Sequence, residues 1–62
     1  MVSKQERYEE LCRKTAIEEG YTDEEMTECT QLHYELDPKA RKQLDGLTPQ
    51  QVWGIDTSKY SN

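Results

Sequence analysis

Apolar and small side chains recur every three or four residues through the first half of the chain, and they never alternate with a period of two. Two such stripes are Tyr8, Cys12 and Thr15, and then Met26, Cys29, His33 and Leu36. This spacing is typical of amphipathic helices rather than strands. We therefore predict an all-α chain with helices over about 4–19, 23–36, 38–45 and 49–53.

Short capping motifs mark where these helices begin. Ser3, Thr22 and Thr48 each precede a Glu or Gln by three residues, which is the spacing of a capping box. Asp37 stands before Pro38, and a residue before proline resists helical geometry. Glycines that favour a left-handed helix end follow three of the segments: Gly20, Gly46 and Gly54.

The first two predicted helices are joined by a short glycine link and should form an antiparallel hairpin. In that register Tyr8 faces His33 and Cys12 faces Cys29. Further apolar side chains flank this seam and need a cover: Leu11, Ile17 and Leu32. The segment after residue 38 is one cover, and a homodimer that forms a four-helix bundle is the alternative.

Composition predicts a small domain with a thin core. The 62 residues carry a net charge of −5, and only nine of them are Leu, Ile or Val. About 60 residues suit one small domain rather than a large enzyme pocket. We therefore expect a single domain over 1–62, with 56–62 as a flexible tail, and no enzymatic activity.

Charge and hydropathy also exclude several kinds of partner. No stretch approaches the roughly 20 apolar residues that span a bilayer, and the first residues run into charge, unlike a secretory signal. We expect a cytoplasmic protein. A net negative charge disfavours nucleic acid and anionic membranes, whose affinity depends on Lys and Arg. A larger protein with a basic surface patch fits the charge better.

Cys12, Cys29 and His33 are the residues with the most chemistry to offer. They could pack as small core side chains, form a disulfide, or hold a metal as a structural site. Zinc needs four ligands, and Glu25 would have to complete the set. Core packing is the preferred interpretation, so we predict no catalytic residue, no metal ligand and no cofactor.

The turn and the second predicted helix resemble a known family. The residues concerned are Gly20-Tyr21-Thr22-Asp23-Glu24-Glu25 and Thr30-Gln31-Leu32-His33-Tyr34. They resemble the small sporulation-type aspartyl-phosphate phosphatases of bacilli, helical hairpins with a Gly-x-Thr turn and a Ser-Gln-x-Leu-Asp signature. His33 and Tyr34 replace the leucine and the essential aspartate, which only a three-residue shift to Asp37 would restore. The resemblance implies a protein that binds a response-regulator surface without the chemistry.

Acidic residues are concentrated around the predicted hairpin turn. Residues 18–28 contain six acidic side chains and no basic one, which we call the acidic tip: Glu18, Glu19, Asp23, Glu24, Glu25 and Glu28. Such a field steers encounter with a basic surface. Trp53 and Tyr60 form a second candidate epitope, since aromatic residues dominate interfaces. We expect an acidic interaction module, by analogy a bacterial or phage regulator or inhibitor of a larger protein.

Overall fold

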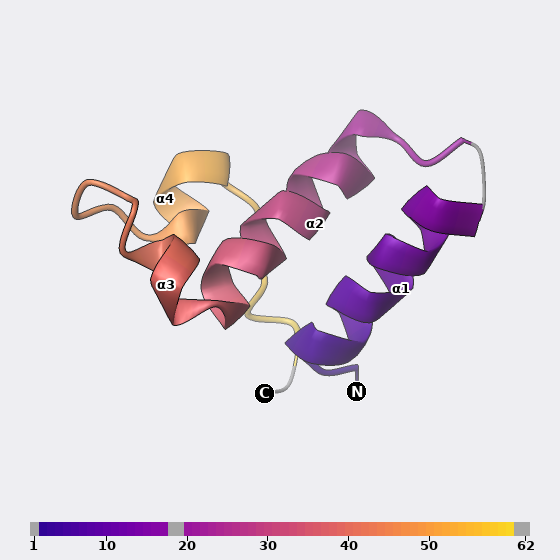
Figure 1. The fold of residues 1–62 in the computed structure, drawn as a ribbon, viewed down its shortest axis with the longest axis horizontal. Coiled ribbons are helices and arrows are strands. Elements are labelled where there is room, and N and C mark those ends of the chain that lie inside the picture. The colour runs from indigo at the N-terminus through magenta and orange to yellow at the C-terminus, as the bar shows by residue number, and fades with distance from the viewer. Residues whose placement is uncertain (1, 18–19, 61–62) are drawn as a thin grey trace.

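The computed structural model describes residues 2–17 and 20–60 and confirms the predicted fold class. Within these ranges the chain has no strand and forms four helices (Figure 1). Their bounds are α1 at Lys4–Ile17, α2 at Asp23–Leu36, α3 at Pro38–Arg41 and α4 at Pro49–Trp53. The predicted hairpin followed by short helices is therefore present.

Helix α2 is the centre of the molecule. α1 packs antiparallel along one side of it, and α3 and α4 lie on its other side (Figure 1). The segment that follows α4 crosses α2 and ends beside the start of α1 (Figure 1). Every other element therefore depends on α2 for its position.

The predicted caps explain where the helices begin. The Thr22 hydroxyl accepts a hydrogen bond from the Glu25 amide at 3.2 Å, and the Glu25 carboxylate accepts one from the Thr22 amide at 3.1 Å. Thr48 and Gln51 form the same reciprocal pair at the start of α4. Ser3 accepts from the amide three residues later at 3.1 Å. These bonds satisfy donors that would otherwise lack a partner in the first helical turn.

One helix end differs from the sequence prediction, and another falls partly outside the described residues. α1 is described as far as Ile17, and positions 18–19 of the predicted helix lie outside the described residues. α3 ends at Arg41 rather than near 45, and the chain continues in turns to Gly46, where φ is +75°. Residues 41–43 are exposed, so little burial supports a longer helix there.

The hydrophobic core is centred on Leu11 and Leu32, which flank the predicted seam and were expected to need a cover, rather than on the seam itself. Leu11 and Leu32 are fully buried, and Ala40 is 7% exposed. The predicted seam has the right register, since the Tyr8 and His33 rings stack at 6.0 Å, but it lies on a partly open face with His33 exposed. Larger aliphatic side chains gain more from burial, so they turn inward.

The last described residues are attached to α2. Thr57 is 2% exposed and donates hydrogen bonds to the Glu35 carboxylate at 2.9 and 3.0 Å. Tyr60 is half-buried and donates to Glu28. That residues 56–62 form a flexible tail is a statement about mobility, and it stays a prediction. Residues 61–62 lie outside the described part of the chain.

Candidate functional site

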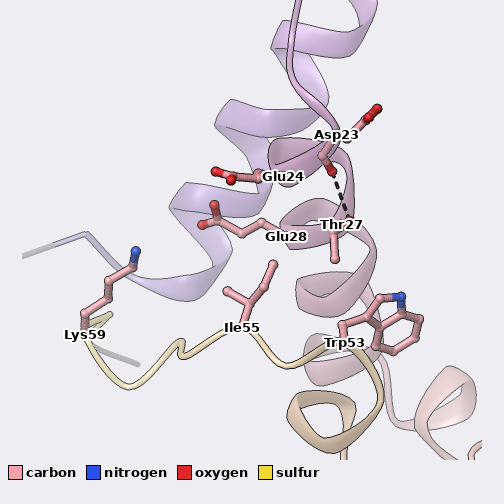
Figure 2. A pocket seen from close by; sticks show the side chains of 7 residues that line it. All are labelled: Asp23, Glu24, Thr27, Glu28, Trp53, Ile55 and Lys59. Atoms are coloured by element: carbon pink, nitrogen blue, oxygen red, sulfur yellow. Dashed lines mark hydrogen bonds between the residues drawn. The ribbon is translucent and has the colours of Figure 1, made fainter.

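A groove of about 520 Å³ runs between the first half of α2 and the segment that follows α4 (Figure 2). It is lined by Asp23, Glu24, Thr27, Glu28, Trp53, Ile55 and Lys59. Four of these residues belong to the predicted binding set: Asp23, Glu24, Glu28 and Trp53. The structure thus brings part of the acidic tip together with the aromatic epitope, which lies nearly thirty positions further along the chain.

The groove has acidic residues at the start of α2. Asp23 and Glu24 occupy its first turn, where negative charge is favoured by the helix dipole, and both are exposed. Within the described residues, no ion pair or side-chain hydrogen bond uses either carboxylate. Glu24 is directed to the same side of α2 as Glu28, whereas Asp23 points the other way (Figure 2). Glu24 is therefore the charged residue best placed to meet a ligand in the groove.

Glu28 has a structural role instead. It is 8% exposed and accepts hydrogen bonds from Arg7 Nε at 3.0 Å and Nη2 at 3.2 Å, with a further bond from the Tyr60 hydroxyl. Burial raises the pKa of Glu28, but the bonds from Arg7 and Tyr60 outweigh burial and leave this pKa below its ordinary value. The carboxylate joins α1, α2 and the chain end, so its charge is already balanced.

Glu25 lies away from the groove. Its carboxylate contacts Lys14 Nζ at 2.5 Å across the hairpin and also accepts from the Thr22 amide. The hydrogen bond from Lys14, followed by that from Thr22, lowers the pKa of Glu25. Of the other predicted acids, Glu18 and Glu19 lie outside the described residues. The acidic tip is thus divided between an exposed pair, two paired carboxylates and an undescribed pair.

Trp53 forms one side of the groove. Its ring lies 4.8 Å from that of Tyr34, at an interplanar angle of 41°, and the side chain is half-buried. Ile55 projects toward α2 in the interior of the groove, and Lys59 lies at the end farthest from Asp23 (Figure 2). Tyr60, also predicted to bind a partner, donates a hydrogen bond to Glu28. Burial, and then this hydrogen bond, raise the pKa of Tyr60.

Gln31 is the residue on which the groove depends and which the sequence reasoning did not identify as part of the site. It is fully buried, its amide nitrogen donates to the Ile55 carbonyl at 2.6 Å, and its amide oxygen accepts from the Ile55 amide at 2.9 Å. The side chain thus satisfies both backbone groups of a residue 24 positions away. A glutamine in a polar helix carries no sequence signal for such a contact.

Cys12 and Cys29 meet across the hairpin as predicted, within hydrogen-bonding reach of each other and without a disulfide. Burial, and then the neighbouring Cys12, raises the pKa of the Cys29 thiol to about 11. A protonated thiol is a poor nucleophile and metal ligand. Across residues 2–17 and 20–60, no three His, Cys, Asp or Glu side chains gather as a metal site.

The residues behind the phosphatase resemblance have local roles. Gln31 holds the backbone of Ile55, and Tyr34 packs on Trp53. Asp37 ends α2 and caps α3, where its carboxylate accepts from the Lys39 amide at 3.0 Å. No contact here favours a catalytic role for Asp37, and the phosphatase-like alternative stays a prediction.

Comparisons with protein-family models, curated proteins and solved structures found no match to this chain. Among the described residues, none of the helices combines the length and apolar character needed to cross a bilayer. Any functional conclusion therefore depends on the chemistry of the groove and its surroundings.

Proposed function

We propose that this chain is a small acidic binding module that docks a basic surface of a larger protein through the start of α2. The observation that carries the proposal is the contrast among the described acids of the tip. Glu25 and Glu28 are paired with cations, whereas Asp23 and Glu24 are exposed and their carboxylates pair with none of the side chains that the structure describes. Apart from its favourable position at the start of α2, this exposed charge is available to a partner.

The anchoring of α2 supports a binding role. Its start is fixed by the Thr22 capping box, and its flank is held to α1 by the Lys14–Glu25 and Arg7–Glu28 pairs. The two exposed carboxylates are therefore presented from a positioned turn. A rigid presentation reduces the ordering entropy that association must overcome.

Regulation or inhibition of the larger protein is the most economical consequence of such binding. A chain of 62 residues that covers a basic surface can block access of another acidic ligand to that surface. A cytoplasmic location belongs to the same proposal, because it was expected from the sequence, and a homodimer stays the alternative that the sequence offered. The proposal assigns no reaction to the chain itself.

Capture from the source cell's lysate tests the proposal. The immobilised chain is compared with a D23N/E24Q variant and with an E6Q/E9Q control, which has the same net charge but changes exposed acids of α1. We expect one protein to be retained by the wild type and the control, and lost with D23N/E24Q or in high salt. If no retained protein distinguishes D23N/E24Q from the control, the proposed docking site is wrong.

A further inference from the structure

The groove offers two kinds of surface side by side. Glu24 supplies an exposed negative charge at the α2 side that pairs with no cation of the described residues, and Ile55 and Trp53 supply apolar surface. Glu28 lies between them, but Arg7 balances its charge and the Tyr60 hydroxyl donates a hydrogen bond to it. The groove is therefore neither a uniform acidic patch nor a purely apolar cleft.

This combination selects the chemistry of an occupant. A Lys or Arg side chain has an apolar stem and a charged end, so its stem can pack on the apolar surface of the groove while its cation approaches Glu24. An apolar neighbour in the same segment would contact Ile55. A volume of about 520 Å³ accommodates a short peptide segment rather than one side chain.

Lys59 adds a repulsive element. It lies in the groove on the chain segment beyond Ile55, with its Nζ atom 5.1 Å from the centre of the Tyr60 ring. A cationic occupant gains from Glu24 but is opposed by Lys59. A contact that selects one charge pattern commonly includes such a repulsive group.

We infer that the groove binds a short segment of the partner protein in which a Lys or Arg is adjacent to an apolar residue. The cation contacts Glu24, and the apolar side chain packs on Ile55 and Trp53. This inference rests on the proposed function, because it names the part of the basic partner that the acidic module recognises. It adds that charge alone is insufficient and that Lys59 weakens binding.

Trp53 provides a direct readout, since it is the only tryptophan in the chain. The probe is an acetylated and amidated six-residue peptide of alternating lysine and leucine. The controls are peptides of the same length in which serine replaces leucine or glutamate replaces lysine. We expect a saturable change in Trp53 emission with the lysine–leucine peptide and at least about tenfold weaker binding of both controls.

The control peptides separate the two levels of the account. If the lysine–serine peptide binds as well as the lysine–leucine peptide, the groove inference is overturned while charge-driven docking survives. An equal response to the glutamate–leucine peptide overturns the groove inference as well, because the groove would then not select a cation. If the groove binds the peptide selectively but the lysate capture fails, the proposed docking to a larger protein is overturned instead.

Two opposite charge changes sharpen the test. We expect Glu24→Gln to lower the affinity for the lysine–leucine peptide and Lys59→Gln to raise it. Each change should be about two- to fivefold, the range of single exposed charge contacts. Glu9→Gln and Lys42→Gln are the matched controls, at exposed positions outside the groove lining. Tighter binding by Lys59→Gln cannot arise from loss of folding, and circular dichroism checks the fold of all four variants.

Two further kinds of result would overturn the inference. One is a Glu24→Gln variant that binds no more weakly than Glu9→Gln, or a Lys59→Gln variant that binds no more tightly than Lys42→Gln. The other is a Trp53 emission change on concentrating the protein alone, with a dimer in sedimentation analysis that the peptide does not displace. In that case a second copy of the chain occupies the groove, for example through its basic residues Lys39, Arg41 and Lys42.

Discussion

Arg7 and Glu28 form the ion pair that joins α1 to α2, and Tyr60 attaches the last described residues to the same carboxylate. The Arg7 and Glu28 side chains are 23% and 11% exposed, so each charge has lost much of its contact with water. A bidentate contact between such groups compensates that loss, and removal of one partner leaves the other charge poorly solvated. Once one of these two charges is buried in the fold, the other is needed to balance it.

Replacement of Arg7 by Met should destabilise the protein by about 1–3 kcal/mol, because Glu28 keeps only the Tyr60 bond. The double variant R7M/E28M should lose less than the two single variants combined, since no buried charge is left behind. Arg13→Met is the control, at an exposed position on α1. Urea unfolding followed by circular dichroism measures the difference, and an equal loss for Arg7 and Arg13 would contradict this role.

Stability should fall at both ends of the pH range. Glu25 and Glu28 have folded-state pKa values below their ordinary value of 4.5, so the stability they add is present above pH 4.5 and is lost as the pH falls through the lowered values. Cys29 and Tyr60 have raised pKa values. Their contribution is present below the ordinary values, 9.0 and 10.0, and is lost as the pH rises through the raised ones.

Thermal midpoints measured from pH 3 to pH 11 test this pattern. Glu28→Gln should flatten the acidic side of the profile, and Cys29→Ala should flatten the alkaline side, because each substitution removes one of the titrating groups. The unchanged side of each profile is the internal control. A wild-type midpoint that does not depend on pH would show that these groups titrate alike in the folded and unfolded chains.

At the scale of the helices, starts and register could be predicted from sequence because they depend on local chemistry. The capping motifs at Thr22 and Thr48 act over three residues, and the glycine link sets which positions of α1 and α2 lie opposite each other. Which of the two stripes on each helix is buried more deeply could not be predicted from local chemistry. Two overlapping stripes fit the helical period, and only assembly shows that Leu11 and Leu32 occupy the interior.

The division of the acidic tip has a simple geometric origin. Consecutive helical residues point about 100° apart, since a turn takes 3.6 residues. Glu24 therefore faces the groove while Glu25 faces Lys14 on α1. Composition identified the group of acids but could not assign its members to sides, because that assignment depends on where α1 and the segment after α4 pack.

The segment after α4 depends on one glutamine. Replacement of Gln31 by Leu keeps the bulk but removes both partners of the Ile55 backbone, so the segment must either bury unsatisfied groups or detach. We expect a loss of about 1–3 kcal/mol and faster hydrogen exchange at the Ile55 amide. Gln43→Leu is the exposed control. Unchanged protection of the Ile55 amide would show that other contacts hold the segment.

At the scale of the whole molecule, the core is as thin as the composition predicted. Among the described residues, the buried apolar side chains are Leu11, Leu32, Ala40 and Pro49. Buried polar contacts supply the remaining order: Gln31 and Thr57 hold the chain end, and Glu28 joins it to α1. Such contacts contribute only modest net stability but define one arrangement of the parts.

Leu32→Ala should bring this small protein close to unfolding. Removal of a fully buried leucine costs about 2–5 kcal/mol, which matches the roughly 3–5 kcal/mol that a core of this size supplies. We expect a large loss of helical circular dichroism at 25 °C, or a folded fraction only at low temperature. Leu47→Ala, at a position that is 51% exposed, should change little. Equal effects at the two positions would contradict the assigned core.

The central claim is that the start of α2 and the segment after α4 together form the binding surface. The most direct test is a nitrogen-15 amide spectrum of the full chain, recorded while the lysine–leucine peptide is added. The account predicts shifts concentrated in residues 23–28 and 53–59. Shifts confined to the exposed positions of α1, at Glu9, Arg13 and Ala16, or no shifts at millimolar peptide, would contradict it.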